Sequence, residues 1–188
     1  MNNYLVGIYG VIGSGKSLAL NRLKDLGANV LSCDEENKLL FLDPSYILEL
    51  KKLFPKAVNG CVDKKKIKEE IFDNNDKKSA LEKLSHDRIR KSILEKTKNG
   101  LWFIEIPLYI EGFLPINESW IVDAPMGVKI NRITERDGIT KELALKIINA
   151  QPPITIKEKK ILLNNGTKQE FLSLVDKEYN DLIKRISF

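Results

Sequence analysis

The sequence of 188 residues predicts an α/β fold in which five parallel strands form one sheet flanked by helices. Two observations predict it: short, apolar, β-prone runs recur along the chain, and segments with helical spacing of apolar residues separate them. A third is a glycine-rich loop directly after the first run, at the sheet edge where such folds bind ligands. The expected strands are 4–9, 29–31, 101–106, 120–123 and 161–163.

The glycine-rich loop is the most informative motif of the chain. It reads Gly10-Val11-Ile12-Gly13-Ser14-Gly15-Lys16-Ser17 and satisfies the phosphate-loop pattern G-x-x-x-x-G-K-[ST] between a strand and a helix. Such glycines let backbone N–H groups curl toward phosphate oxygens, and the helix N-terminus adds partial positive charge. We expect Lys16 to reach the outer phosphates of a nucleotide and the Ser17 hydroxyl to ligate Mg²⁺. The predicted nucleotide-binding residues of this motif are Val11, Ile12, Gly13, Ser14, Gly15, Lys16, Ser17 and Leu18.

Residues 34–100 are expected to form a helical insertion in a single domain spanning 1–188. The predicted helices are 35–42, 44–54, 63–72 and 76–98, with Asp63 and Asp76 as N-caps and no strand among them. An insertion of this size is where a nucleotide-type kinase would hold its phosphate acceptor. Near the end of the chain, Thr167 and Glu170 have the spacing of a capping box that starts the last helix.

Asp34 directly follows the second predicted strand. At the carboxyl end of a parallel strand it would face the phosphate loop and could accept a hydroxyl proton or hold a magnesium-bound water. The alternative is that Asp34 caps a helix starting near Glu35. The sequence leaves both roles open.

Arg132 and Arg136 are four residues apart in the helix expected after Asp123, so their side chains share a face. Two guanidinium groups near a nucleotide would stabilise the charge that phosphoryl transfer spreads over the transferred oxygens. The alternative is a surface pair with partners such as Glu135 or Asp137.

Composition limits the other classes of function. The net charge of +5, from 31 basic and 26 acidic residues, is modest and gives no reason to expect nucleic-acid binding. Two cysteines make no disulfide framework at this size. The chain enters a predicted core strand at once, and no apolar run approaches the ~20 residues of a membrane helix. We therefore expect a cytoplasmic protein with small-molecule partners and no membrane association.

Taken together, the motifs resemble those of the dephospho-coenzyme A kinase family over nearly the whole chain. Besides the loop, the matching segments are 26–34, Leu-Ser-His-Asp-Arg-Ile-Arg at 84–90, Glu-Ile-Pro-Leu-Tyr-Ile-Glu at 105–111, Arg132 to Gly138, Ala150-Gln151, and Asn164-Asn165-Gly166. The resemblance implies a P-loop NTPase fold with a short lid over 137–160. It implies phosphorylation of the ribose 3′-hydroxyl of dephospho-coenzyme A by ATP with Mg²⁺.

The resemblance also implies roles for individual residues. Asp34 would be the general base, and Lys16 and Arg136 would complete the catalytic set, with Arg132 and Arg136 on the ATP phosphates. The acceptor site would contain Asp34, Lys38, His86, Arg90, Pro107 and Leu108. Lys38 occupies the position of a usual arginine, and His86 is expected to bind or to support structure.

Three other readings remain open. A nucleoside or nucleotide kinase would share the loop, the insertion and the arginines. An inactive relative that only binds coenzyme A species or nucleotides would fit the replacement of a family aspartate by Ser32 and the short lid. A nucleotide-dependent switch would need a D-x-x-G element after a strand, and Asp137-Gly138 lacks that spacing.

Overall fold

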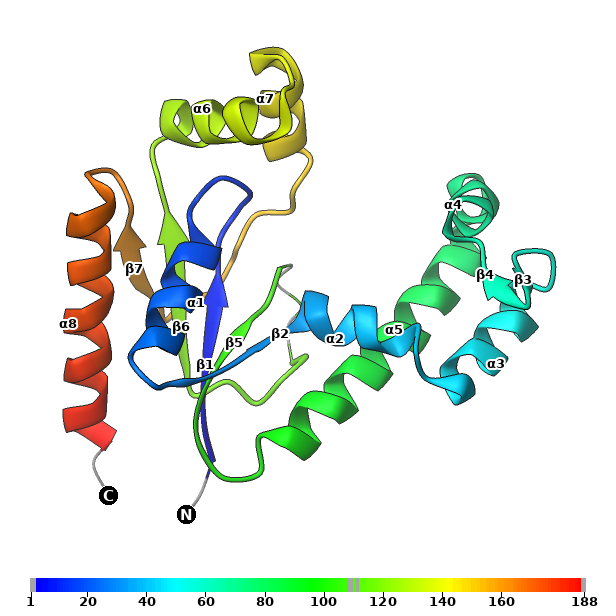
Figure 1. Ribbon diagram of the computed structural model, residues 1–188, viewed down its shortest axis with the longest axis horizontal. Coiled ribbons are helices and arrows are strands. Elements are labelled where there is room, and N and C mark those ends of the chain that lie inside the picture. Colours follow the sequence, from blue (N-terminus) through cyan, green and yellow to red (C-terminus); the bar gives the residue numbers. More distant parts are fainter. Residues whose placement is uncertain (1–2, 108–109, 111, 187–188) are drawn as a thin grey trace. The chain divides into compact units, whose positions relative to one another are not determined.

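The computed structural model describes residues 3–107, 110 and 112–186. The chain forms two compact units, residues 1–32 with 97–188, and residues 33–96. The first unit contains a five-stranded sheet with the order β2-β5-β1-β6-β7, in which all neighbours are parallel (Figure 1). Its strands are β1 (Asn3–Tyr9), β2 (Asn29–Ser32), β5 (Gly100–Glu105), β6 (Glu118–Asp123) and β7 (Lys160–Leu163). The predicted fold class and all five predicted strands are confirmed.

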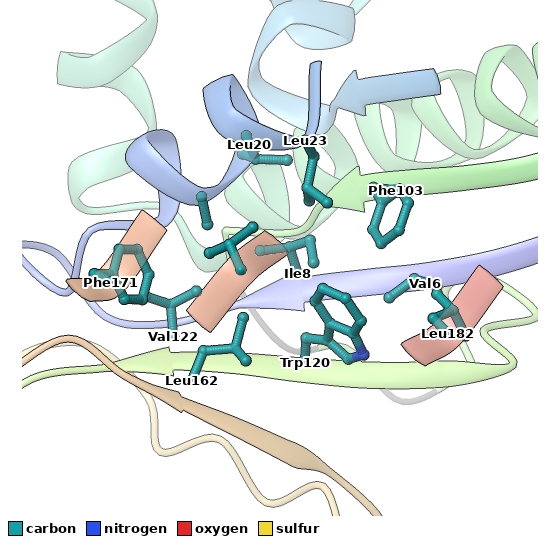
Figure 2. Close-up of a cluster of buried hydrophobic side chains, with 12 residues drawn as sticks. Val6, Ile8, Leu20, Leu23, Phe103, Trp120, Val122, Leu162, Phe171 and Leu182 are labelled. Carbon is teal, nitrogen blue, oxygen red and sulfur yellow. The ribbon is translucent and has the colours of Figure 1, made fainter. Parts of the chain in front are cut away.

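One face of this sheet carries the hydrophobic core. The helices of the unit are α1 (Lys16–Asp25), α6 (Met126–Asp137), α7 (Lys141–Asn149) and α8 (Lys168–Ile186). Figure 2 shows side chains of four strands gathered with those of α1 and α8. Phe103 and Trp120, both fully buried, meet edge to face with ring centroids 5.3 Å apart. Burial of these alternating strand residues attaches both helices to the sheet.

The carboxyl ends of the strands position the glycine-rich loop. In Figure 1 the arrows of β1, β6 and β7 point toward the end where α6 and α7 lie. The glycine-rich loop leaves β1 at this end and leads into α1. The carboxyl ends of β1, β6 and β7 therefore surround the loop with the starts of their following segments, as in other parallel sheets that bind ligands.

The second unit is mostly helical. It contains α2 (Cys33–Leu40), α3 (Pro44–Leu53), α4 (Lys64–Phe72) and α5 (Asn75–Lys96), which confirms the four predicted helices. The expectation that this stretch has no strand is wrong, because β3 (Val58–Asn59) and β4 (Cys61–Val62) form an antiparallel hairpin. Gly60 turns between them with φ +75°, a conformation that glycine adopts without cost. Strands of two residues are too short to show an alternating pattern.

One of the two N-caps predicted for the second unit is confirmed. The Asp63 side chain accepts from the N–H groups of Lys65 and Lys66, so its N-cap role is confirmed. The N-cap expected at Asp76 is wrong: α5 begins one residue earlier, and the side chain of Asn74 accepts from an N–H of its first turn. An asparagine before the aspartate reaches the same orphan donors from a better position.

The capping box of α8 is confirmed. The Glu170 carboxylate accepts from the Thr167 N–H at 2.7 Å, and the Glu170 N–H donates to the Thr167 hydroxyl at 3.2 Å. Both cysteines are free, one buried and one exposed. Within the described ranges, no helix combines the length and apolar character that a membrane crossing requires.

The packing of the core predicts a large difference in stability between alanine substitutions at two neighbouring positions of α8. Leu182 is fully buried in the cluster of Figure 2, whereas Ile183 is 37% exposed. Leu182→Ala is expected to lower the free energy of unfolding by about 2–5 kcal/mol, because it removes buried methyl groups and leaves a cavity. Ile183→Ala, the matched control, should cost well under half as much. Urea unfolding of both variants measures the difference, and equal losses would contradict this packing.

Candidate active site

Arg132 of α6 holds the glycine-rich loop from outside. Its guanidinium donates to the carbonyl oxygens of Gly13 and Ser14, each at 3.3 Å. The same guanidinium donates to the side-chain amide oxygen of Asn164 at 3.0 Å. The arginine thus joins the loop to the segment that follows β7, and its planar fork suits several acceptors at once.

Asn164 provides the second outside contact. It is 1% exposed, and its side-chain N–H donates to the Ser14 carbonyl at 2.9 Å. Gly15, with φ +104°, lies so close to this amide that a Cβ there would collide with it. A glycine is therefore required at this position for two reasons, the backbone conformation and the space that Asn164 occupies.

Two side chains of the loop, one lysine and one serine, belong to the residues predicted to bind the nucleotide. The Lys16 ammonium donates to the Gly10 carbonyl at 2.6 Å. The Ser14 hydroxyl is fully buried, and in the described part of the chain it is the buried side-chain polar atom that lacks a hydrogen-bond partner. Such an unsatisfied group calls for an explanation, and a ligand oxygen in the loop would satisfy it.

The remaining loop residues take their places around these contacts. The Ile12 N–H donates to the Gln151 side chain at 2.8 Å, and the Ser14 N–H donates to the Val11 carbonyl. Leu18 follows in the first turn of α1 and donates its N–H to the Gly15 carbonyl. Two loop amides are thus engaged within the protein, so the loop is held in shape by its own unit.

The two arginines of α6 differ in their surroundings. Whereas Arg132 faces the loop, the Arg136 side chain is 60% exposed and pairs with Asp137 through two hydrogen bonds of 2.7 and 2.8 Å. The hydrogen bond from Arg136 lowers the pKa of the Asp137 carboxyl. The surface pairing considered from the sequence therefore describes Arg136 in this structure but not Arg132.

The predicted acceptor residues of the inserted unit lie on two helices. Asp34 and Lys38 are exposed and one turn apart on α2, and His86 and Arg90 are one turn apart on α5. Because α2 begins at Cys33, Asp34 belongs to its first turn. The alternative role of Asp34 as an N-cap before a helix starting near 35 is thereby wrong.

Pro107 directly follows Ile106, a buried residue just after the end of β5. Leu108, the other residue predicted there, lies outside the described residues. Sequence reasoning missed Glu105 at the carboxyl end of β5, which accepts a 2.9 Å hydrogen bond from the Ser32 hydroxyl. The signal was available: a carboxylate that ends an apolar parallel strand lies at the ligand edge of the sheet.

A magnesium ion would need few ligands from this protein. The described residues contain no group of three or more His, Cys, Asp or Glu side chains arranged to hold a metal. Mg²⁺ at phosphate sites is held largely by substrate oxygens and water, with one or two protein groups. The exposed Ser17 in the first turn of α1 fits that need.

A strand, a glycine loop with its lysine, and an arginine-bearing helix over a parallel sheet define a P-loop NTPase fold. A family model described as dephospho-CoA kinase matches residues 4–170, and the chain belongs to that family. A dephospho-CoA kinase of Legionella pneumophila is 31% identical over 194 residues, covering 96% of each chain.

Solved structures agree over the whole chain. The crystal structure of a Thermus thermophilus protein superposes with a TM-score of 0.81 at 28% identity, covering 99% of both chains. A dephospho-CoA kinase from Campylobacter jejuni gives 0.71 at 27% identity, covering 98% of both. The recognised family and the enzyme class, a kinase, are thereby confirmed.

The loop contacts predict that Arg132 supports nucleotide affinity. Arg132→Met removes charged donors from two loop carbonyls and should raise the ATP dissociation constant about tenfold, or ~1.4 kcal/mol. Arg22→Met is the matched control, because Arg22 pairs with Asp176 of α8 toward the far end of α1. Isothermal titration with ATP measures both. An unchanged constant in Arg132→Met would rule out this role.

Proposed function

We propose that this chain transfers a phosphoryl group from ATP to the ribose 3′-hydroxyl of dephospho-coenzyme A, which forms coenzyme A. The observation that carries the proposal is the phosphate loop, held by Arg132 and Asn164, in a chain of this kinase family. Phosphoryl transfer needs mainly positioning and electrostatic stabilisation, and the loop, its lysine and α6 supply both.

The donor half of the site lies in the first unit. Residues 11–18 would cradle the ATP phosphates, and the Lys16 ammonium would exchange its contact with the Gly10 carbonyl for an outer phosphate. Arg132, which donates to the loop carbonyls, would also contact the ATP phosphates. Arg136, next to the proposed lid over 137–160, would exchange Asp137 for phosphate oxygens. Such cations stabilise the negative charge that the transfer spreads over the phosphoryl group.

Mg²⁺ is the proposed metal, held by the Ser17 hydroxyl and, through water, by Glu105. When bound, it would neutralise charge on the β- and γ-phosphates. The strand register supports this proposal, because Glu105 pairs with Ile8 of β1, two residues before the loop begins. The Ser32 hydroxyl orients its carboxylate.

The acceptor half is assigned to the inserted unit. Asp34 would take the proton of the 3′-hydroxyl as general base, and its exposed position in the first turn of α2 keeps the carboxylate ready for substrate. Lys38, His86 and Arg90 would bind the acceptor, together with Pro107 and Leu108 after β5. A cytoplasmic location suits this pairing of ATP with a thiol-bearing substrate.

A mass-spectrometric assay tests the function directly. The protein is incubated with ATP, Mg²⁺ and dephospho-coenzyme A beside a panel of nucleosides and nucleoside monophosphates. We expect one phosphoryl group to be added to dephospho-coenzyme A and to no other acceptor. Chelation of the metal should abolish this transfer, and added Mg²⁺ should restore it. Transfer to a nucleoside or nucleotide would replace the acceptor assignment, and ATP binding without any transfer would identify an inactive relative.

Asp34→Asn tests the general base. The amide cannot accept the hydroxyl proton, so the turnover number should fall by about 10²–10⁴ while ATP affinity stays within about twofold. Glu35→Gln is the control, because Glu35 is an equally exposed carboxylate in the same helical turn. Steady-state kinetics with ATP binding measured separately decides it. Unaltered turnover in Asp34→Asn would remove this residue from the chemistry.

Lys16→Ala tests the phosphate loop. Without the ammonium, both ATP affinity and the rate should fall, each by about tenfold or more, because the lysine contacts outer phosphates in the ground and transition states. Lys24→Ala, at the exposed far end of α1, should leave both unchanged. Full activity of Lys16→Ala would be incompatible with the proposed donor site.

A further inference from the structure

Lys129 is a buried lysine in the first turn of α6, and none of the roles above uses it. The residue is 8% exposed, and its ammonium donates to the Asp123 carboxylate at 3.0 Å. Lysines are rarely buried without a partner, because desolvation of the charge is costly. The ion pair with Asp123 keeps this ammonium in the protein and joins the end of β6 to α6.

The backbone of Lys129 lies against the loop itself. A Cβ built at Gly13 would stand 2.8 Å from the Lys129 carbonyl oxygen and 3.1 Å from its Cα. Gly13, with φ +79°, therefore packs directly on this turn of α6. Arg132, three residues further along the helix, donates to the Gly13 and Ser14 carbonyls. Any shift of this turn would move both contacts.

Asp123 is the common anchor of the two elements that hold the loop. Its side chain accepts from Lys129 and from the Ala124 N–H, and its backbone oxygen accepts from the Asn164 N–H at 2.7 Å. Asn164 in turn donates to the Ser14 carbonyl. The end of β6 is thus connected to the loop in two ways. One connection runs from Asp123 through Lys129 and α6, and the other runs from Asp123 through Asn164.

We propose that Lys129 is a positioning residue for nucleotide binding, which rests on the proposed function of the loop. Its ion pair with Asp123 holds the turn of α6 on Gly13 and so places the Arg132 guanidinium on the loop carbonyls. Lys129 acts through Arg132 and the loop, and it contacts neither ATP nor the acceptor. It therefore sets ATP affinity without affecting affinity for dephospho-coenzyme A.

Lys129 also lines a cavity of about 290 Å³ together with Gly10, Val11 and Lys159. A direct contact between its ammonium and a phosphate is the competing explanation, and a double-mutant cycle separates the two. The ATP dissociation constant is measured by isothermal titration for the full chain, for Lys129→Met, for Arg132→Met and for the double variant. The control is Lys160→Met, whose lysine pairs with Glu178 between β7 and α8.

Lys129→Met is expected to weaken ATP binding about tenfold and to leave the KM for dephospho-coenzyme A unchanged. In the Arg132→Met background the same substitution should have no further effect, because the guanidinium that it positions is gone. Lys160→Met should leave the ATP dissociation constant unchanged, while lowering the melting temperature about as much as Lys129→Met does. A purely structural role for Lys129 would instead produce the same outcome as Lys160→Met.

Two outcomes would overturn the proposal. The first is an ATP constant that Lys129→Met leaves unchanged. The second is an effect that multiplies with that of Arg132→Met, because Lys129 would then not act through the guanidinium. A multiplicative effect that is also larger for ATP than for ADP would mean direct contact with the outer phosphate. If Lys129→Met does not fold, Lys129→Gln replaces it, because the glutamine keeps an N–H donor for Asp123. Lys129→Gln is expected to lower ATP affinity about threefold in the wild-type background and not at all in the Arg132→Met background. A loss of affinity that multiplies with that of Arg132→Met would overturn the proposal.

The binding cycle stands apart from the test of the acceptor. If the wild-type chain bound ATP but did not phosphorylate dephospho-coenzyme A, the proposed reaction would fail and the cycle would still report on Lys129. If the wild-type chain did not bind ATP, the proposed donor site would fail first, and the inference about Lys129 would fail with it.

Discussion

The carbonyl oxygen of Ser14 is the point on which the phosphate loop depends. Arg132 of α6 and Asn164 after β7 both donate to it, so two segments distant in sequence hold the loop backbone at this residue. A loop that must surround a ligand cannot satisfy all of its own polar groups, and outside donors spare it that cost. The buried hydroxyl on the same residue has no hydrogen-bond partner among the residues that the structure describes.

The sheet explains why these donors meet. Neighbouring parallel strands end at the same edge, and β6 and β7 lie beside β1 there. Asp123, the last residue of β6, accepts from the backbone N–H of Asn164 and from the side chain of Lys129. The loop geometry is therefore built on the hydrophobic core beneath it, since Trp120 and Val122 of β6 are buried against α1 and α8.

The sequence predicted much of this fold for identifiable reasons. Strands of four to seven residues and helices with clear apolar spacing carry a strong periodic signal, and the Thr167–Glu170 capping box carries a local one. The hairpin around Gly60 escaped because two residues show no period. The capping position of α5 was wrong by two residues because both Asn74 and Asp76 have suitable side chains, and only the backbone path selects between them.

By itself, the sequence determined the class of the protein, since the loop pattern, its strand and its helix are local and each residue type has a physical reason for its place. Tertiary structure alone decided which of two similar arginines serves the loop: four residues apart on one helix, Arg132 reaches its carbonyls and Arg136 pairs with Asp137. It also decided that Asn164, Asp123 and Lys129 support the loop. These contacts join residues up to 150 positions apart, and no local pattern encodes a pairing that exists only once the strands lie side by side.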